Sequence, residues 1–127
     1  MPDIFSEGPD RSWWRESVVY QLYVHSFKDS SGDGIGDLNG IITKLDYLSD
    51  LGIDIIQLSA IYDSSLTGDM GYNVRNHKKI LAEYGTMDDW KRLCDEVHNR
   101  KMRLIMDLVI THTSKEVRSL NLINSLE

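Results

Sequence analysis

The 127-residue sequence has one cysteine, no long apolar run and no excess of basic residues. The lone Cys94 cannot form an internal disulfide, and its place in a helical pattern favours a buried structural thiol. No run of about 18 apolar residues is present, so a membrane-spanning helix is not expected. The opening segment MPDIFSEGPDRS also lacks the apolar core of a signal peptide. We therefore expect a cytoplasmic protein with no membrane partner.

Acidic residues outnumber basic ones by 20 to 14, which gives a formal net charge of −6. Such a surface repels the phosphates of nucleic acids and the headgroups of anionic lipids. We therefore expect no nucleic-acid partner, and a neutral or cationic ligand fits the charge better.

Three short apolar runs, at residues 18–24, 53–59 and 104–110, are rich in β-branched residues. Such nearly continuous runs are typical of strands buried on both faces of a parallel sheet. Two helical patterns separate them. The first ends at Gly52, where a left-handed cap is expected, and its apolar residues follow a 3.6-residue period: Leu38, Ile41, Ile42, Leu45, Leu48 and Leu51.

The second helical pattern begins with a capping-box variant formed by Thr86 and Asp89. Its apolar side recurs at helical spacing, through Trp90, Leu93, Cys94 and Val97. The chain thus reads β-α-β, long loop, α-β, which predicts an α/β fold with a parallel sheet. Periodicity alone does not separate an open sheet from a closed barrel.

The stretch DSSGDGIGD, residues 29–37, follows the first expected strand. Its glycine spacing does not fit a dinucleotide-binding loop, and its carboxylates would repel a phosphate. Its oxygen-bearing residues instead alternate as in the first part of a calcium loop, although Gly40 stands where the closing bidentate glutamate would be. The spacing predicts a site for Ca²⁺, or less well Mg²⁺, and the alternative is a solvated turn. The expected ligands are Asp29, Ser31, Asp33, the backbone carbonyl of Ile35, and Asp37.

Five ordered blocks carry a family resemblance: SWWRESVVYQLYVHSFKDSSGDGIGDLNGIITKLDYLSDLGID, LSAIYDSS, DMGYNV, YGTMDDW and MDLVITHTS. They resemble the N-terminal part of α-glucosidases and oligo-1,6-glucosidases of glycoside hydrolase family 13, the α-amylase superfamily. The resemblance implies the first three β-α units of a (β/α)8 TIM barrel, Ca²⁺ in the 29–37 loop and a sugar at the C-terminal face. It divides the chain into an N-terminal arm (1–12), a partial barrel domain (13–116) and a divergent tail (117–127). The agreement fades after Ser114, and the segment KEVRSLNLINSLE is hypothesised to arise by frame change or read-through.

The resemblance also assigns sugar contacts. Tyr72 resembles the aromatic platform under the terminal glucose ring. Asn73 stands where the family has an aspartate that grips the sugar hydroxyls, so the charge is lost. His112 matches the histidine that contacts the sugar and favours the charged transition state. Asp107 is interpreted as a structural, ion-paired acid.

Other departures lie near the expected pocket: Val24 and His25 for Pro-Arg, Gln57 for Trp, Ala60 for Pro and Thr111 for Asn. The family takes its nucleophile and its acid/base from the fourth and fifth strands, and only three such strands are expected here. No complete catalytic site is therefore predicted.

We predict a truncated α-glucosidase-like protein that is inactive alone, with α-glucoside oligosaccharides as substrates of the parent. The alternative is a non-catalytic binding protein, as in the amylase-like ectodomains of amino-acid transporter heavy chains. The uncovered strands and helices also make self-association possible.

Overall fold

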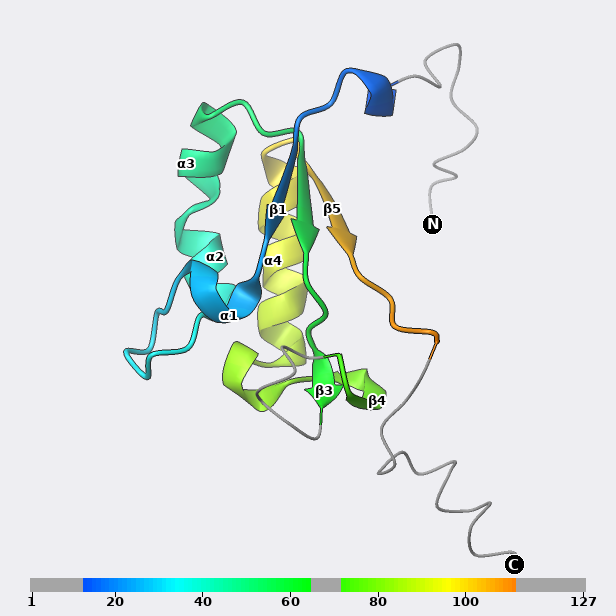
Figure 1. The fold of residues 1–127 in the computed structure, drawn as a ribbon. Helices are drawn as coiled ribbons and strands as arrows, with labels where there is room; N and C mark the ends of the chain where they lie inside the picture. Colours follow the sequence, from blue (N-terminus) through cyan, green and yellow to red (C-terminus); the bar gives the residue numbers. More distant parts are fainter. Residues whose placement is uncertain (1–12, 65–71, 112–127) are drawn as a thin grey trace, which may run out of the picture.

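The structure is a computed structural model, and it describes residues 13–64 and 72–111. A three-stranded parallel sheet, helices on one side of it and a small hairpin make up this part of the chain (Figure 1). The elements are η1 (Trp13–Arg15), β1 (Val19–Leu22), α1 (Val24–Phe27), α2 (Leu38–Thr43), α3 (Leu45–Asp50), β2 (Ile55–Leu58), β3 (Tyr62–Ser64), β4 (Val74–Ile80), η3 (Ala82–Tyr84), α4 (Met87–Asn99) and β5 (Arg103–Met106).

The parallel sheet has the order β1-β2-β5, so the central strand is the second along the chain. Gln57 of β2 pairs in register with Gln21 of β1 and with Ile105 of β5. The predicted parallel α/β arrangement is therefore confirmed. In the described residues the sheet is open, because β1 and β5 have no strand on their outer sides.

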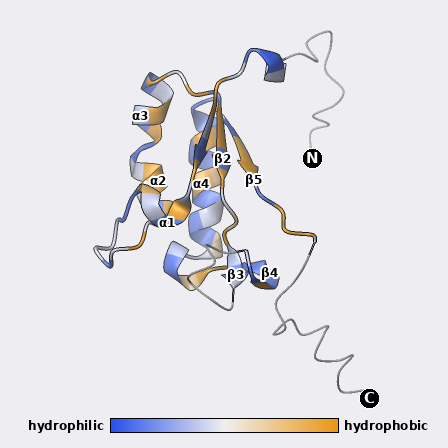
Figure 2. Ribbon diagram, in the orientation of Figure 1, coloured by the Kyte–Doolittle hydropathy of each residue, from blue (hydrophilic) through white to orange (hydrophobic). Residues whose placement is uncertain are grey.

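The main core lies between the sheet and its helices. Alternate strand residues face it, together with the apolar sides of α2, α3 and α4. Figure 2 shows hydrophobic colouring on β2 and β5 and on parts of the helices beside them. The strand residues of this core are Tyr20, Leu22, Ile56, Leu58, Leu104 and Met106.

The expectation that all three strands are buried on both faces is wrong for the outer two. Only β2 is buried or half-buried along its whole length. On the face turned away from the helices, Val19 of β1 is 48% exposed and Ile105 of β5 is 45% exposed. In the part of the chain that the structure describes, no second layer covers this face of the sheet. We call it the open sheet face.

The helix predicted over residues 38–51 is broken at Lys44 into α2 and α3. The Thr43 hydroxyl donates to the Gly40 carbonyl (2.6 Å), and the Lys44 amide donates to the Ile41 carbonyl (2.9 Å). Both bonds span three residues, which tightens the backbone and interrupts the regular helical ladder. The predicted left-handed cap at Gly52 is confirmed by its φ of 88°.

The capping box of α4 is confirmed. The Thr86 hydroxyl accepts from the Asp89 amide (3.2 Å), and the Asp89 carboxylate accepts from the Thr86 amide (2.8 Å). These bonds satisfy two backbone donors that the first turn would leave unpaired. Leu93 and Val97 then bury the apolar side of the helix.

The antiparallel hairpin of β3 and β4 lies within the region predicted only as a long loop. The strand β4 has the sequence VRNHKKI, whose charged residues mask the usual strand pattern. An ion pair between Arg75 of β4 and Asp63 of β3, at 2.7 Å, joins the two strands of the hairpin.

Among the described helices, none is long and apolar enough to cross a membrane. The proposed N-terminal arm (1–12) and tail (117–127) lie outside the described residues.

Candidate functional site

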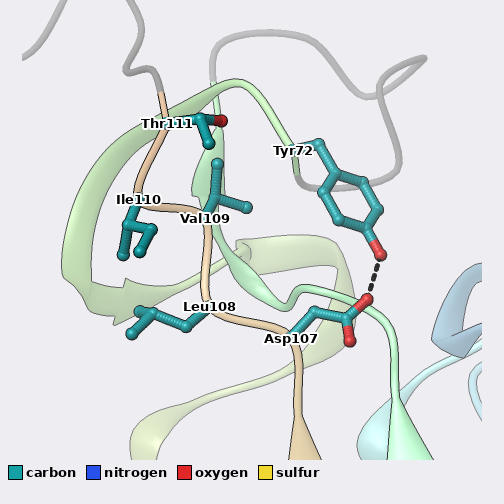
Figure 3. A pocket seen from close by; sticks show the side chains of 6 residues that line it. All are labelled: Tyr72, Asp107, Leu108, Val109, Ile110 and Thr111. Carbon is teal, nitrogen blue, oxygen red and sulfur yellow. Dashed lines mark hydrogen bonds between the residues drawn. The ribbon is translucent and has the colours of Figure 1, made fainter.

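A pocket of about 330 Å³ opens at the carboxyl end of the parallel sheet, just beyond β5 (Figure 3). One wall comes from the loop before β4 and the other from the segment that leaves β5. Its lining residues are Tyr72, Asp107, Leu108, Val109, Ile110 and Thr111.

Tyr72 and Asp107 form a hydrogen-bonded pair in this pocket. The Tyr72 hydroxyl donates to Asp107 Oδ2 at 2.5 Å, as the dashed line in Figure 3 marks. Burial, followed by this bond to a carboxylate, raises the pKa of Tyr72 to about 12. The phenol therefore stays protonated at neutral pH and keeps donating to Asp107.

Gln57 supplies the second contact of Asp107. Gln57 lies on β2, and its Nε2 donates to Asp107 Oδ1 at a distance of 3.3 Å. Among the described residues the side-chain partners of Asp107 are therefore the neutral Gln57 and Tyr72, and the ion-paired role expected for it stays a prediction. The backbone helps as well, because the Asp107 amide donates to the Leu58 carbonyl (3.2 Å).

The segment after β5 is also tied to the hairpin. His77 Nε2 lies 3.0 Å from the Val109 carbonyl oxygen, and the His77 ring packs on Tyr62 with a centroid distance of 5.2 Å. Val109, Tyr62, Ala60 and Val74 form a small second core beneath the pocket. The pocket wall therefore rests on the hairpin.

The pocket combines a half-buried phenol ring, apolar side chains, the Thr111 side chain and one carboxylate. Such a surface suits a neutral ligand that has both apolar faces and hydroxyl groups. It does not suit hydrolysis by the retaining mechanism, which needs two carboxylates about 5 to 5.5 Å apart. Asp107 is the single carboxylate among the described lining residues.

Of the three predicted sugar contacts, the structure describes Tyr72 and Asn73. Tyr72 lines the pocket. Asn73 follows it, half-buried, and is not among the lining residues. His112 lies outside the described residues. The link from Gln57 to Asp107 was not predicted, since the sequence signalled Gln57 only as a departure from the family's tryptophan.

The 29–37 loop joins α1 to α2 and is closed at its base by backbone. The Gly36 amide donates to the His25 carbonyl (2.7 Å), and the Asp37 amide donates to the Lys28 carbonyl (3.0 Å). A Cβ on Gly36 would lie 2.0 Å from the Val24 carbonyl oxygen, so only glycine allows this approach.

Two of the predicted metal ligands organise the loop itself. The Asp29 carboxylate accepts from the amides of Gly34 (2.8 Å) and Gly32 (2.7 Å), which lowers the pKa of Asp29. Asp37 is buried and caps α2 by accepting from the Gly40 amide (2.6 Å). It also accepts from both the amide and the hydroxyl of Ser30.

The donor set fits a hard cation chemically, because each of the three carboxylates keeps unused lone pairs. Asp29 Oδ2 and Asp37 Oδ2 each accept one hydrogen bond, and Asp33 accepts only through Oδ1, from the Ile35 amide (2.8 Å). No described Lys, Arg or His forms an ion pair with them. Among the described residues, no three Asp, Glu, His or Cys side chains lie close enough together to form a metal-ligand cluster.

Comparison with known proteins identifies the family. The family model described as Alpha amylase, catalytic domain, matches residues 21–125. The chain belongs to this family. The resemblance to glycoside hydrolase family 13 is thereby confirmed, together with the partial α/β fold that it implied.

Relatives in the family are close in sequence and much longer. The chain is 58% identical to oligo-1,6-glucosidase of Bacillus cereus over 107 residues, which are 84% of this chain and 19% of that protein. It is 53% identical to trehalose-6-phosphate hydrolase of Bacillus subtilis (strain 168) over 104 residues, covering 82% of this chain and 18% of that protein.

A solved structure gives the same result. An isomaltulose synthase mutant from Erwinia rhapontici NX5 in complex with D-glucose matches with a TM-score of 0.86 and 53% identity, over 90% of this chain and 20% of that one. The chain thus spans about a fifth of the length of the relatives that it matches.

Proposed function

We propose that this chain carries the part of an α-glucosidase that recognises the terminal glucose unit. In a whole catalytic domain it would serve the hydrolysis of α-glucosidic bonds in maltose-type and isomaltose-type oligosaccharides. The oligo-1,6-glucosidase names of the relatives support this substrate class.

The observation that carries the proposal is the bond between Tyr72 and Asp107 in the pocket. It holds the phenol ring beside the apolar Val109 and leaves the ring as a platform (Figure 3). Glucose offers C–H faces to such a ring and hydroxyls to the carboxylate. His112, as the next residue after the pocket wall, is proposed as a further sugar contact. Asn73 is proposed to weaken the grip, because a neutral amide replaces the family's charged group.

Sugar binding tests the proposal directly. Titration of the ¹⁵N-labelled chain with methyl α-glucoside should shift amide signals around residues 107–111. Tyr72→Ala should abolish these shifts, whereas Tyr47→Ala should keep them, because Tyr47 is exposed on α3. An unchanged titration in Tyr72→Ala would remove Tyr72 from the site.

We also propose that the 127-residue chain by itself is a truncated, inactive form of such an enzyme. One carboxylate lines the described pocket, and loss of an essential catalytic group costs several orders of magnitude in rate. Maltose, isomaltose and a nitrophenyl α-glucoside should therefore be hydrolysed no faster than background.

A His112→Ala preparation serves as the contamination control for that assay. Activity present in the parent chain and absent from His112→Ala would show that the chain holds a catalytic site of its own. Binding without turnover is equally the behaviour of a non-catalytic amylase-like binding protein. Joining the chain to the remaining strands of an oligo-1,6-glucosidase domain separates the two, because only the enzyme part gains activity.

The 29–37 loop is proposed to bind Ca²⁺, and to bind Mg²⁺ with lower affinity. The proposed ligands are Asp29, Ser31, Asp33, the Ile35 carbonyl and Asp37. Bound there, the cation would offset the charge of three carboxylates and hold the loop between α1 and α2.

A cytoplasmic location is also proposed. It is supported by the free thiol of Cys94, because free thiols persist in a reducing compartment.

Asp33 is the variant site that tests Ca²⁺ binding cleanly. Among the described residues its side chain accepts one hydrogen bond, from the Ile35 amide, whereas Asp29 shapes the loop and Asp37 caps a helix. Calorimetry with Ca²⁺ alone should detect binding in the parent chain and in Asp95→Ala, a change on α4, and should lose it in Asp33→Ala. Equal binding in all three proteins would exclude the site.

A further inference from the structure

Gln57 lies outside the pocket but contacts Asp107, the one carboxylate among the described lining residues. It is half-buried on β2, on the open sheet face, and it is not among the residues that line the pocket. Its in-register neighbour on β5 is Ile105, and Asp107 follows two residues later on the same face. The Gln57 amide reaches along this face to Asp107 Oδ1.

The strand β2 therefore fixes Asp107 twice. Its Leu58 carbonyl accepts from the Asp107 amide at 3.2 Å, and its Gln57 side chain donates to the Asp107 carboxylate at 3.3 Å. The other carboxylate oxygen is then turned toward the Tyr72 hydroxyl, which donates at 2.5 Å. The three side chains form a linear series from β2 to the pocket.

We propose that Gln57 is a positioning residue for ligand binding: it orients the Asp107 carboxylate and, through it, the ring of Tyr72. The functional part of this inference rests on the proposed sugar-recognition function. The structural part, from Gln57 to Tyr72, does not.

The series also sets the hydrogen-bonding character of the pocket. Both Asp107 oxygens accept from protein donors, and the Tyr72 hydrogen is directed at Asp107. The Tyr72 oxygen, which also has a backbone hydrogen bond from Ala60, can then act toward a ligand only as an acceptor, so a ligand hydroxyl that meets it must donate. A neutral polyol meets this requirement.

The structural step is tested by the ionisation of Tyr72 in the full 127-residue chain. The chain carries six tyrosines, so ¹³C-tyrosine labelling with Tyr72→Phe assigns the signal. In the parent chain Tyr72 should stay protonated from about pH 9 to about pH 11. In Gln57→Met the carboxylate loses its anchor and turns from the phenol, so the pKa of Tyr72 should fall below its value in the parent chain, although burial still raises it.

Gln21→Met is the matched control. Gln21 pairs in register with Gln57 on the same face, and the change removes the same amide from β1 instead of β2. Tyr72 should behave as in the parent chain. Gln57→Asn, one methylene too short to reach Asp107, should repeat the effect of Gln57→Met with the polarity retained. Amide spectra establish that each variant is folded.

The opposite outcome is equally defined. Loss of the amide without loss of orientation would leave Asp107 with more concentrated charge, which holds the Tyr72 proton more tightly. An unchanged or higher pKa of Tyr72 in both Gln57 variants therefore overturns the proposal.

The functional step is tested by methyl α-glucoside binding in a double-mutant cycle. Gln57→Met should weaken binding about five- to tenfold, the size expected for one hydrogen bond. In an Asp107→Asn background the same change should have no further effect, because Gln57 acts through Asp107. An equal loss in both backgrounds would contradict this route. If the parent chain binds no sugar, the proposed function fails while the ionisation result for Tyr72 still stands or falls separately.

Discussion

At the scale of single residues, the buried hydroxyl of Tyr84 makes no hydrogen bond among the described residues. The Tyr84 ring is 1% exposed and belongs to the main core. Its hydroxyl has no hydrogen-bond partner among the described residues, and burial raises its pKa. A buried polar group without a partner costs free energy, so here the core is less stable than an apolar equivalent.

Tyr84→Phe should therefore stabilise the chain. The ring stays in place and the uncompensated hydroxyl is removed, so the free energy of unfolding should rise by about 1 kcal/mol. Urea denaturation measures it, with Tyr47→Phe as the control because Tyr47 is exposed on α3. A less stable Tyr84→Phe would mean that the hydroxyl has a partner after all.

The residues of the pocket were only partly predictable. Tyr72 could be named because its surrounding motif resembles a family block. The partners of Asp107 could not, because Tyr72 lies 35 positions away in sequence and Gln57 lies 50 positions away. Contacts at such separations depend on strand register, and a one-residue slip would turn Gln57 to the other face.

At the scale of elements, α4 shows how local sequence specifies a boundary. Thr86 and Asp89 fix its first turn, and the spacing of apolar residues fixes the side that is buried. The neighbouring α3 is joined to it by Arg100, whose guanidinium contacts Asp46 at 2.8 Å and Glu96 at 2.7 Å. Both carboxylates raise the pKa of Arg100. The cap joins residues that are close in sequence, so the sequence predicts it. The ion pair between Arg100 and Asp46 joins residues that are far apart in sequence and forms only when the chain folds.

Thr86→Ala should lower the free energy of unfolding by about 1 kcal/mol, the usual cost of removing a hydroxyl cap. The lost bond is the one from the Asp89 amide to the Thr86 hydroxyl. Thr86→Ser keeps the hydroxyl and should retain most of the stability. Thermal unfolding followed by circular dichroism distinguishes the two variants, and an equal loss in both would rule out the cap as the cause.

Asp89 should also make stability depend on pH. The backbone hydrogen bond from Thr86 is the largest cause that lowers the pKa of Asp89 below its unfolded value. Its contribution is therefore complete above the unfolded pKa of about 3.9 and is lost as the pH falls through the folded pKa. The stability difference between the parent chain and Asp89→Asn should be largest near neutral pH and shrink in acid. A difference that is constant with pH would contradict this linkage.

The elements as a whole follow the sequence pattern where one face is apolar, and depart from it elsewhere. The three parallel strands and α4 were predicted, because burial imposes a period on their residues. The break at Lys44 was not, since it arises from a hydroxyl-to-carbonyl bond within a regular apolar pattern. The strand β4 was missed because it is stabilised by pairing with β3 and by Arg75, and only Val74 in it is buried.

At the scale of the whole molecule, the part of the chain that the structure describes covers the sheet on one side only. All the helices named in the main core pack on the same face, while Val19 and Ile105 lie on the open sheet face. Apolar exposure continues past β5, where Leu108 is 64% and Ile110 is 80% exposed. Exposed apolar side chains of this kind favour association, and the edges of β1 and β5, which pair with no further strand among the described residues, add unpaired backbone groups.

The isolated 127-residue chain should therefore be oligomeric or aggregation-prone, as light scattering after size-exclusion chromatography would show. Placing charge on the open sheet face with Val19→Glu and Ile105→Glu should raise the monomer fraction, because burying two carboxylates between copies is costly. The pair Tyr47→Glu and Leu51→Glu adds the same charge at two other exposed apolar residues, on and just after α3. It should leave the association largely unchanged if the open sheet face is the contact. Equal dissociation by both pairs would assign the effect to net charge, and a monomeric parent chain would show that the open sheet face does not drive association.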